Sequence, residues 1–415
     1  MAQKVLLEPD VQFIREVNKR GGDTLKKCYQ CATCSVACPI SPDNKPFPRK
    51  EMIDASWGLS DRLVSDVDVW LCHQCGDCSV RCPRGARPGD VLGAIRNYAI
   101  EYYAKPKALA RAVNDPKMLP VLIAIPTVLF LVLGLITGLL DFTPEPLHEG
   151  VLSHGDFFST WLVDIIFIPA AIFAVVAFAL GLRNFVTDMH ASSVREKKVA
   201  IEKFDVKDFL KSLPSTIVTI LKHDKFTQCG ENTERATTHM MVLYSFIGLF
   251  IVTTFFFFVL YGSMFYQWMS NGYQDFFGHA YEHAWHSPYS QWNPVKWLAN
   301  ISGIALLVGG LVMLKNRLGK DPQHAKNSYQ DWFLIGLVIG LAATGLGAEM
   351  TRLAGAAFWT YLVYFIHLIF VFGLFVYTPY SKLAHLVYRT VAMMYAEYAG
   401  REEKVKETAV EPAAA

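Results

Sequence analysis

Residues 28–39 read CYQCATCSVACP, and residues 72–83 read CHQCGDCSVRCP. Both stretches have the pattern C-x2-C-x2-C-x3-C-P, which is the spacing of bacterial two-cluster ferredoxins. Three thiolates at such short gaps wrap three corners of one iron–sulfur cube, whereas the fourth cysteine, turned away at the proline, ligates the other cube. The pattern therefore predicts a helical, ferredoxin-like N-terminal domain that holds two [4Fe–4S] clusters.

The crossed arrangement assigns the ligands of each cluster. The first set is Cys28, Cys31, Cys34 and Cys82, and the second is Cys72, Cys75, Cys78 and Cys38. Structural zinc is the alternative, but zinc sites are usually built from two C-x2-C pairs that lie well apart in sequence. Two complete copies of the ferredoxin spacing favour iron–sulfur clusters. The ninth cysteine, Cys229, stands alone and is interpreted as a structural thiol.

Composition divides the chain into a cysteine-rich, soluble part up to about residue 116 and a strongly apolar part from residue 119 onward. Eight of the nine cysteines lie before residue 83, which is not how a secreted disulfide framework is distributed, so a reducing compartment is expected. The N-terminus lacks the apolar core of a signal peptide. The near balance of 39 basic and 37 acidic residues gives no global field that would attract nucleic acid.

Six apolar stretches are long enough to cross a bilayer, since about 20 helical residues match a hydrocarbon core about 30 Å thick. They cover about 119–140, 161–182, 239–267, 297–314, 332–348 and 356–380. The segments after the second and fourth stretches are rich in Lys and Arg, whereas residues 141–160 contain neither. The positive-inside rule then predicts a multi-pass protein of the cytoplasmic membrane with both termini in the cytoplasm.

Three histidines, His239, His367 and His385, lie in or at the ends of apolar stretches, where an imidazole is costly unless it has a partner or a function. His367 and His385 are 18 residues apart, or five helical turns, so both are expected on one face of the last helix, which Pro379 would bend. His239 and His385 share the inner depth and would clamp one haem iron. Hydrogen-bonded contacts between helices remain the alternative.

The outer histidine, His367, lacks an obvious opposing ligand, because Leu249 and Phe250 stand where one is expected. A histidine from a re-entrant 279–286 segment, a methionine, or the absence of a second haem all remain open. Six histidines outside the spans are interpreted as solvated side chains: His190, His223, His279, His283, His286 and His324. One or two b haems are therefore expected.

These patterns predict an all-α chain with four parts: a two-cluster domain at 1–105, a linker at 106–118, a six-helix transmembrane haem b bundle at 119–390 and a cytoplasmic tail at 391–415. At the outer end of the fifth span, Glu349 and Arg352 lie one helical turn apart. A salt bridge between them is the plain interpretation. Alternatively, a carboxylate at the membrane edge takes up protons from a quinol.

A quinone head would have to enter between spans, near a haem edge. Tyr361 and Tyr364 add possible hydrogen-bond donors beside Glu349 at the outer end of the bundle. A rival inner pocket would lie near Lys382 and His385. The outer site is the slightly favoured prediction.

The motifs resemble known families. The two cysteine stretches are similar to the small iron–sulfur subunit of heterodisulfide reductases. The segments TGLGAEMTR at 344–352, YFIHL at 364–368 and PYSKLAH at 379–385 resemble the cytochrome b subunit of those enzymes and the gamma subunit of respiratory nitrate reductase. The fusion of both parts resembles the C subunit of the quinone-interacting membrane-bound oxidoreductase (Qmo) complexes, over about residues 20–390.

This resemblance implies a subunit that joins menaquinone, through haem b and the clusters, to two flavin and iron–sulfur subunits. Through them it would reach adenylylsulfate reductase in dissimilatory sulfate reduction. In the nitrate reductase relatives, two histidines of an early span pair with two of the last; His239, His367 and His385 match three of these positions, and Leu249 stands at the fourth. A heterodisulfide reductase-like partner and a non-redox, zinc-binding membrane anchor are the alternative functions.

Overall fold

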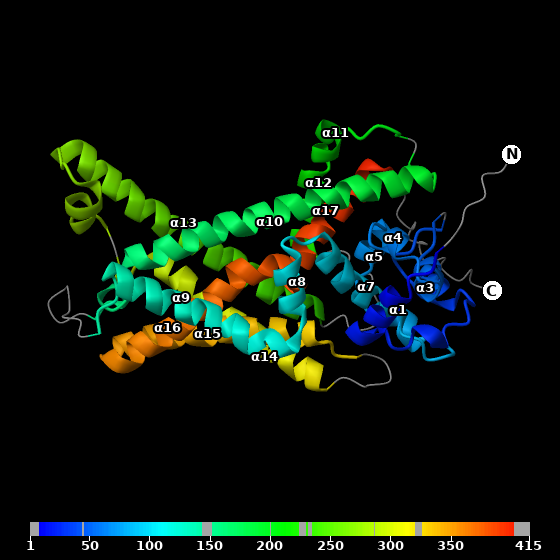
Figure 1. The fold of residues 1–415 in the computed structure, drawn as a ribbon, viewed down its shortest axis with the longest axis horizontal. Helices are drawn as coiled ribbons and strands as arrows, with labels where there is room; N and C mark the ends of the chain where they lie inside the picture. Colours follow the sequence, from blue (N-terminus) through cyan, green and yellow to red (C-terminus); the bar gives the residue numbers. More distant parts are fainter. Residues whose placement is uncertain are drawn as a thin grey trace, which may run out of the picture.

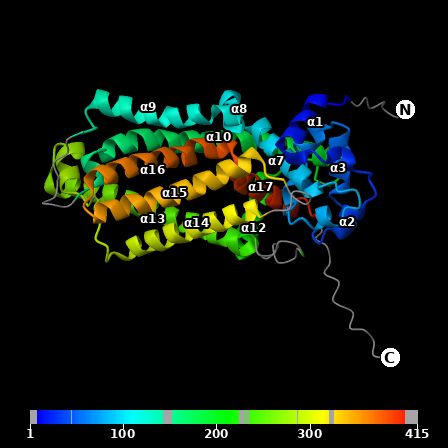
Figure 2. The same ribbon diagram turned by 90° about the horizontal axis from the view of Figure 1, so that it is seen from below.

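The computed structural model describes residues 8–43, 45–142, 152–199, 201–223, 230, 235–285, 287–319 and 326–401. Within these ranges the chain is built from helices, and its β-structure is a single antiparallel bridge between Leu140 and Phe158. The expected all-α class is confirmed. Long helices run side by side along the longest axis of the molecule, and the N-terminal helices form a domain at one end (Figures 1 and 2).

Among the described residues, six helices are long and apolar enough to cross a membrane, as expected. They are Pro116–Thr137, which includes α9 (Leu119–Thr137), then α10 (Thr160–Arg195), α13 (Arg235–Asn271), α14 (Pro294–Leu318), α15 (Tyr329–Leu353), and Ala357–Tyr380, which includes α16 (Ala357–Tyr377). Only 17–33% of their most apolar windows is buried inside the protein. Most of this apolar surface therefore faces outward, which suits contact with lipid.

Glycines allow the membrane-length helices to pack closely, as small residues do in membrane proteins. A Cβ atom added at Gly309 of α14 would lie 2.9 Å from a methyl group of Val242 in α13. One added at Gly340 of α15 would collide with the ring of Phe370 in α16. The helices α13 to α16 thus form a row of neighbours in chain order.

The last span does not continue as one helix to His385, so the expectation that His367 and His385 share one helix face is wrong. The helix α16 ends at Tyr377 and is followed by the short helices η7 (Thr378–Tyr380) and η8 (Lys382–Ala384), before α17 (His385–Tyr398) begins. Pro379 lacks the backbone N–H that would continue the ladder, and Ser381 is extended, with φ −103° and ψ 176°. His385 is therefore the first residue of a new helix.

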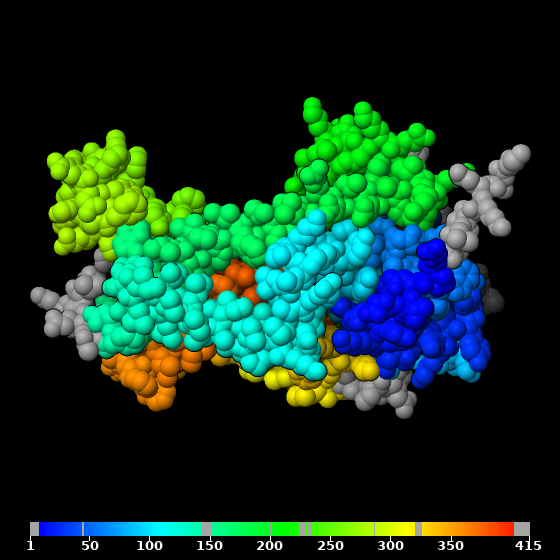
Figure 3. Space-filling view, in the orientation of Figure 1, coloured from blue at the N-terminus to red at the C-terminus, as the bar shows by residue number. Residues whose placement is uncertain are grey.

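The N-terminal domain consists of short helices joined by the cysteine segments. They are α1 (Val11–Val17), η1 (Asn18–Gly22), η2 (Leu25–Lys27), α2 (Thr33–Ala37), α3 (Arg49–Ser56), α4 (Ser60–Leu63), α5 (Val67–Leu71), α6 (Asp77–Val80), α7 (Pro88–Tyr103) and α8 (Lys107–Asn114). Residues 201–223, with α11 (Val206–Lys211) and α12 (Leu213–Lys222), stand out beside this domain, whereas residues near 265–285, including η6 (Phe276–Ala280), stand out at the other end of α10 (Figure 3).

Aromatic packing joins the N-terminal domain to α10 and α17. Trp70, which is fully buried, stacks on Tyr388 of α17 at a ring distance of 5.4 Å and contacts Phe185 of α10 edge-on at 5.5 Å. Tyr103 of α7 packs against the same Phe185 ring at 5.3 Å. Trp70 lies two positions before Cys72, so this shared core holds the second cysteine segment against the membrane-length helices.

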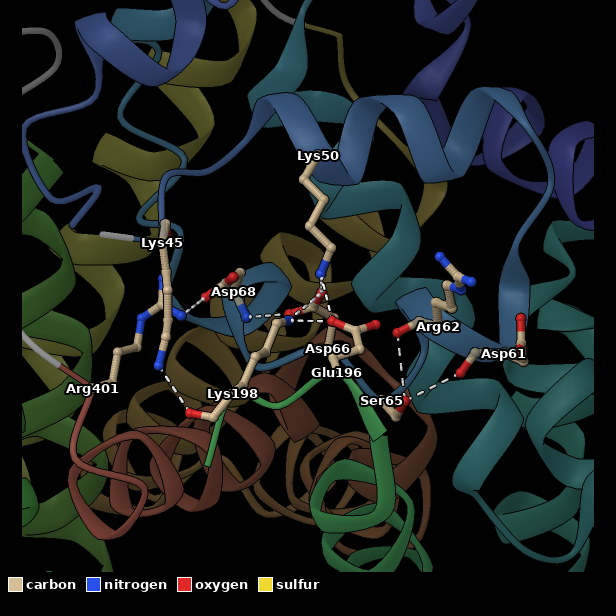
Figure 4. A network of polar contacts seen from close by, with 10 residues as sticks. All are labelled: Lys45, Lys50, Asp61, Arg62, Ser65, Asp66, Asp68, Glu196, Lys198 and Arg401. Atoms are coloured by element: carbon tan, nitrogen blue, oxygen red, sulfur yellow. Dashed lines mark hydrogen bonds and ion pairs between the residues drawn. The ribbon is translucent and has the colours of Figure 1, made fainter. Parts of the chain in front are cut away.

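A buried polar network reinforces this junction (Figure 4). The Asp66 carboxylate accepts from Lys50 at 3.2 Å and from Lys198, which follows α10, at 3.3 Å. Asp68 pairs at 2.5 Å with Arg401, which follows α17. Because Asp66 and Asp68 lie at the start of α5, ion pairs from two distant segments fix the helix that leads to Cys72.

Candidate functional site

The two cysteine motifs fold alike. In the first, Gln30 and Ala32 adopt left-handed conformations with φ of 60° and 68°, and in the second Gln74 and Gly76 do so with φ of 52° and 103°. The Gln30 N–H donates to the Cys28 sulfur at 3.4 Å, and the equivalent Gln74 N–H donates to Cys72 at 3.3 Å. These turns wrap the chain around the sulfur atoms, and α2 and α6, which follow them, pack together.

The second predicted ligand set lines one cavity. Cys72, Cys75 and Cys78 contribute from the second motif, and Cys38 reaches the cavity from the first. Phe47 and Pro48 help to close it. This placement matches the crossed assignment inferred from the sequence, which stays a prediction about ligation.

Three members of the first predicted set, Cys28, Cys34 and Cys82, also lie close together. Burial, together with the neighbouring Cys28 and Cys82 thiolates, raises the pKa of Cys34 to about 11. Burial and the nearby thiolates of the second set likewise raise the pKa of Cys38 to about 12. Sulfur atoms this close cannot all ionise unless metal ions compensate their charge. The donor set therefore fits iron–sulfur clusters, which bind thiolates.

The two sets differ in exposure. Cys31 is exposed, whereas Cys38, Cys72 and Cys78 are buried. A hydrogen bond with Thr33 and, more weakly, the charge of Arg49 lower the pKa of Cys31. The first set thus lies near the surface of the domain and the second lies deeper. Cys229 falls outside the described residues.

His239 and His385 come together near the N-terminal ends of α13 and α17. Their ring centroids lie 6.4 Å apart, with the ring planes inclined by 74°. Two imidazoles on opposite sides of one metal are separated by about 6 Å, since each metal–nitrogen bond is about 2 Å long. The pair therefore fits a shared axial site, and the surrounding pocket is lined by Thr219, Ile220, Leu386, Thr390 and Met393.

Both histidines are oriented by hydrogen bonds of the kind that fix metal ligands. His385 Nδ1 lies 2.6 Å from the Lys382 carbonyl oxygen, a contact that would leave Nε2 to bind a metal. His239 Nδ1 lies 2.8 Å from His223 Nε2. Burial lowers the pKa of His385 to about 4, so its imidazole is neutral near pH 7, as a metal ligand must be.

The prediction that His223 is a solvated side chain is wrong. Its side chain is 4% exposed and lines the pocket that contains His239 and His385. Its sequence neighbours, Lys222 and Asp224, gave no sign of burial; the packing of α12 on α17 places it there. The expectation of solvation is also wrong for His190, which is buried within 3.0 Å of the Tyr395 hydroxyl and 3.1 Å of the Glu202 carbonyl oxygen.

His73 joins the two pockets. It follows Cys72 directly, is buried, and lines both the cavity of the second cysteine set and the histidine pocket. A guanidinium nitrogen of Arg389 in α17 lies 3.0 Å from its Nδ1 and 2.9 Å from its Nε2. One side chain thus separates the two candidate redox sites. Sequence reasoning missed it, because its only signal is its place beside a cysteine.

His367 lies in the seam between α15 and α16. Its Nδ1 is 3.0 Å from the Thr344 hydroxyl, and its ring packs against Gly345. His154, which sequence reasoning did not consider, packs against the Tyr364 ring at a centroid distance of 4.5 Å and lies 3.4 Å from the Ala348 carbonyl oxygen. These contacts place His154 near His367, about one helical turn away along α15 and α16.

The other groups weighed for this position lie elsewhere. His279 and His283 are exposed and stack on Tyr273, at 6.0 and 5.5 Å. Phe250 is 72% exposed and faces outward, whereas Leu249 packs between helices. His286 and His324 fall outside the described residues.

Glu349 pairs with a lysine from another helix. Its carboxylate lies 2.6 Å from the Lys296 ammonium group of α14. The salt bridge of Glu349 therefore joins two helices, whereas the sequence predicted a partner on the same helix, Arg352. Tyr361 stacks on Phe157 at 5.1 Å. At the opposite end of α15, Lys382 forms an ion pair with Asp331, which also binds Arg317 at 2.9 Å.

Comparisons with known proteins bear on the cysteine domain. Residues 24–86 match the family model of the 4Fe-4S dicluster domain. The C subunit of the H(2):CoB-CoM heterodisulfide,ferredoxin reductase of Methanothermobacter marburgensis is 38% identical over 91 residues, which are 22% of this chain and 49% of the relative. The iron–sulfur C 2 subunit of the CoB–CoM heterodisulfide reductase of Methanocaldococcus jannaschii is 35% identical over 109 residues, 24% of this chain and 58% of the relative.

A third relative, citrate utilization protein B of Escherichia coli, is 30% identical over 119 residues, 28% of this chain and 31% of the relative. The chain thus spans about half the length of the first relatives it matches. No solved structure matches it. The N-terminal part is therefore an iron–sulfur, electron-transfer domain related to the C subunits of the heterodisulfide reductases, joined in this chain to six helices of membrane-spanning length.

Proposed function

We propose that the chain is the membrane subunit of a quinone-linked oxidoreductase that passes electrons between menaquinol, haem b and two [4Fe–4S] clusters. The observation that carries the proposal is the position of His73, which lines the cavity of the second cysteine set and the histidine pocket alike. Redox groups in these two pockets would be neighbours, separated by one side chain. Such an arrangement suits electron transfer between a membrane site and a cytoplasmic domain.

In this proposal His239 and His385 would hold the inner haem b, which would supply one-electron chemistry when bound. His223 and the Lys382 carbonyl hold the two imidazoles in place. Arg389 lies in the same pocket, where its charge would favour the reduced cofactor or bind a propionate. The alternative, in which the histidines only bond helices together, requires no cofactor in this pocket.

The outer end of the bundle is our candidate for quinol oxidation. Glu349 is a carboxylate at the membrane edge, and Lys296 holds it in position. His154, Tyr361 and Tyr364 lie at the same end and could hydrogen-bond a quinone oxygen. Proton release to Glu349 would accompany each electron that leaves the quinol. Thr344, bonded to His367, would orient that histidine toward a second haem.

The partners follow from the resemblance to Qmo complexes: two flavin and iron–sulfur subunits and, beyond them, adenylylsulfate reductase in dissimilatory sulfate reduction. The second candidate function keeps the same chemistry but assigns a heterodisulfide reductase-like partner. The relatives matched by the cysteine domain, which are subunits of such reductases, favour it. The fusion of the cysteine part and the membrane part in one chain favours the Qmo-like function.

A stopped-flow experiment tests the proposal. The purified full chain is mixed with a menaquinol analogue while haem absorbance is recorded, and frozen samples report the clusters by electron paramagnetic resonance. We expect the haem to become reduced before the clusters do. His73→Ala should keep all spectra but slow cluster reduction, whereas His279→Ala, at an exposed outer position, should change neither.

Two results would contradict the proposal. A colourless protein that contains zinc would support the non-redox anchor. A coloured protein whose clusters and haem stay oxidised with quinol, but accept electrons from dithionite, would remove the quinone link and leave only the iron–sulfur function.

A further inference from the structure

The loops that carry the first cysteine set are strongly basic. Residues 24–42 and 78–89 contain no Asp or Glu. Five cationic side chains surround these loops and are exposed: Lys26, Lys27, Arg49, Arg81 and Arg84. Arg49 is anchored beside the motif, because its Nε donates to the Gln30 carbonyl oxygen at 2.8 Å. The surface above the first cluster position is therefore positive.

These cations are not consumed by ion pairs inside the protein. Within the part of the chain that the structure describes, none of the five contacts a carboxylate, whereas the nearby Arg87 binds Asp23 at 2.6 Å and Asp90 at 3.0 Å. Two clusters with four thiolates each offset part of the charge. The outward-facing guanidinium and ammonium groups still leave a field that favours an acidic molecule.

An apolar centre lies among the charges. Tyr29 is 68% exposed and Val36 is 80% exposed, and both belong to the first cysteine motif, as does the exposed Cys31. Arg84 lies over the Tyr29 ring at 4.1 Å and donates to its hydroxyl at 3.0 Å. An exposed tyrosine and arginine within a charged rim have the composition of a protein–protein contact site.

We propose that this basic face, defined by Lys26, Lys27, Tyr29, Val36, Arg49, Arg81 and Arg84, docks the acidic surface of a soluble flavin or iron–sulfur protein. The inference rests on the proposed function and deepens it by ordering the two clusters. The second set lies beside His73 and the histidine pocket, and the first lies at the surface. One electron would pass from the reduced first cluster, which is oxidised, to the partner's flavin or cluster, which is reduced.

Other occupants suit the face less well. An anionic membrane surface is disfavoured, because α2 lies in the domain at the end of the molecule away from the membrane-length helices (Figure 2). A second copy of the chain would bring two positive faces together. Charge complementarity thus favours an acidic protein as the partner of this face.

The test uses the full chain, with its clusters, and flavodoxin as a small acidic flavin protein. Binding and electron transfer to flavodoxin are measured in stopped flow at low and high salt. The double variant Lys27→Glu/Arg84→Glu should lower the association rate about tenfold or more, and salt should weaken wild-type binding. Lys203→Glu/Lys207→Glu makes the same charge change at exposed positions outside the face and should have little effect.

Three outcomes would overturn the docking face. Equal losses in the two double variants would show that only net charge matters. Binding to vesicles with anionic phospholipid that exceeds binding to flavodoxin, or no salt-sensitive binding at all, would also overturn it. Cluster spectra, recorded on each variant, separate this failure from failure of the proposed function, because quinol reduction of the clusters does not involve these cations.

Discussion

Glu51 lies close to Asp66 and Asp68, two carboxylates of the network in Figure 4, and provides a prediction whose size can be worked out. Glu51 is fully buried and, within the described residues, neither of its carboxylate oxygens has a hydrogen-bond partner. Burial and the nearby Asp66 and Asp68 carboxylates raise its pKa well above the usual range. The network contains four carboxylates and three cations. The carboxylates are Glu51, Asp66, Asp68 and Glu196, and the cations are Lys50, Lys198 and Arg401. A proton on Glu51 would balance the charge.

The sign of the pH dependence follows from this shift. A group whose pKa is raised in the folded state contributes stability that is complete below its unfolded pKa and is lost as pH rises through the folded pKa. While folded Glu51 keeps its proton and the unfolded chain does not, the free energy of local unfolding falls by about 1.4 kcal/mol per pH unit. Burial and Asp66 raise the pKa of Asp68 to about 6, so measurements above pH 6.5 avoid most of its titration.

Glu51→Gln replaces the protonated acid by a neutral group of the same shape and should remove this slope. Hydrogen exchange of peptides from α3 and α5, measured by mass spectrometry between about pH 6.5 and 8.5, gives the opening free energy of this region. We expect a wild-type opening free energy that falls by up to about 2.7 kcal/mol across this range, relative to the variant. Glu8→Gln, at an exposed position outside the network, should behave like the wild type.

Parallel pH curves for the wild type and Glu51→Gln would refute the reasoning, because Glu51 would then carry no proton. Exchange that accelerates on addition of EDTA would identify a cation as the balancing charge instead. Glu51, Asp66 and Asp68 offer oxygens within 4.8 Å of one another, which makes that outcome a specific alternative.

Three further predictions concern the cofactor sites. Cys82→Ser should alter the electron paramagnetic resonance signal of the first cluster although it lies in the second motif; a change confined to the second cluster would refute crossed ligation. His385→Ala and His239→Ala should each abolish the spectrum of the inner haem. His223→Ala should shift the reduction potential of this haem but leave the haem bound; loss of all haem in His223→Ala would make that residue a ligand. Glu349→Gln should slow haem reduction by a menaquinol analogue at least several-fold with unchanged spectra, and unaltered kinetics together with a defect in Lys382→Ala would move the quinone site to the inner side.

The sequence alone determined the features that depend on local pattern. The cysteine spacing predicted the cluster domain, because ligand geometry fixes the gaps between neighbouring thiolates. The apolar stretches predicted six helices of spanning length, because the bilayer fixes how many apolar residues a span needs. Both signals lie within short segments, so no knowledge of the fold was needed.

Only the tertiary structure decided which distant residues meet. His223 looked solvated until α12 packed on α17, and His73 linked the two pockets only because Arg389 and the second cysteine cavity converge on it. Glu349 forms its ion pair with Lys296 of α14 rather than with Arg352 on its own helix. The last span ends before His385, because Pro379 and the extended Ser381 interrupt the helix. Contacts between segments far apart in sequence depend on packing, which leaves no periodic trace along the chain.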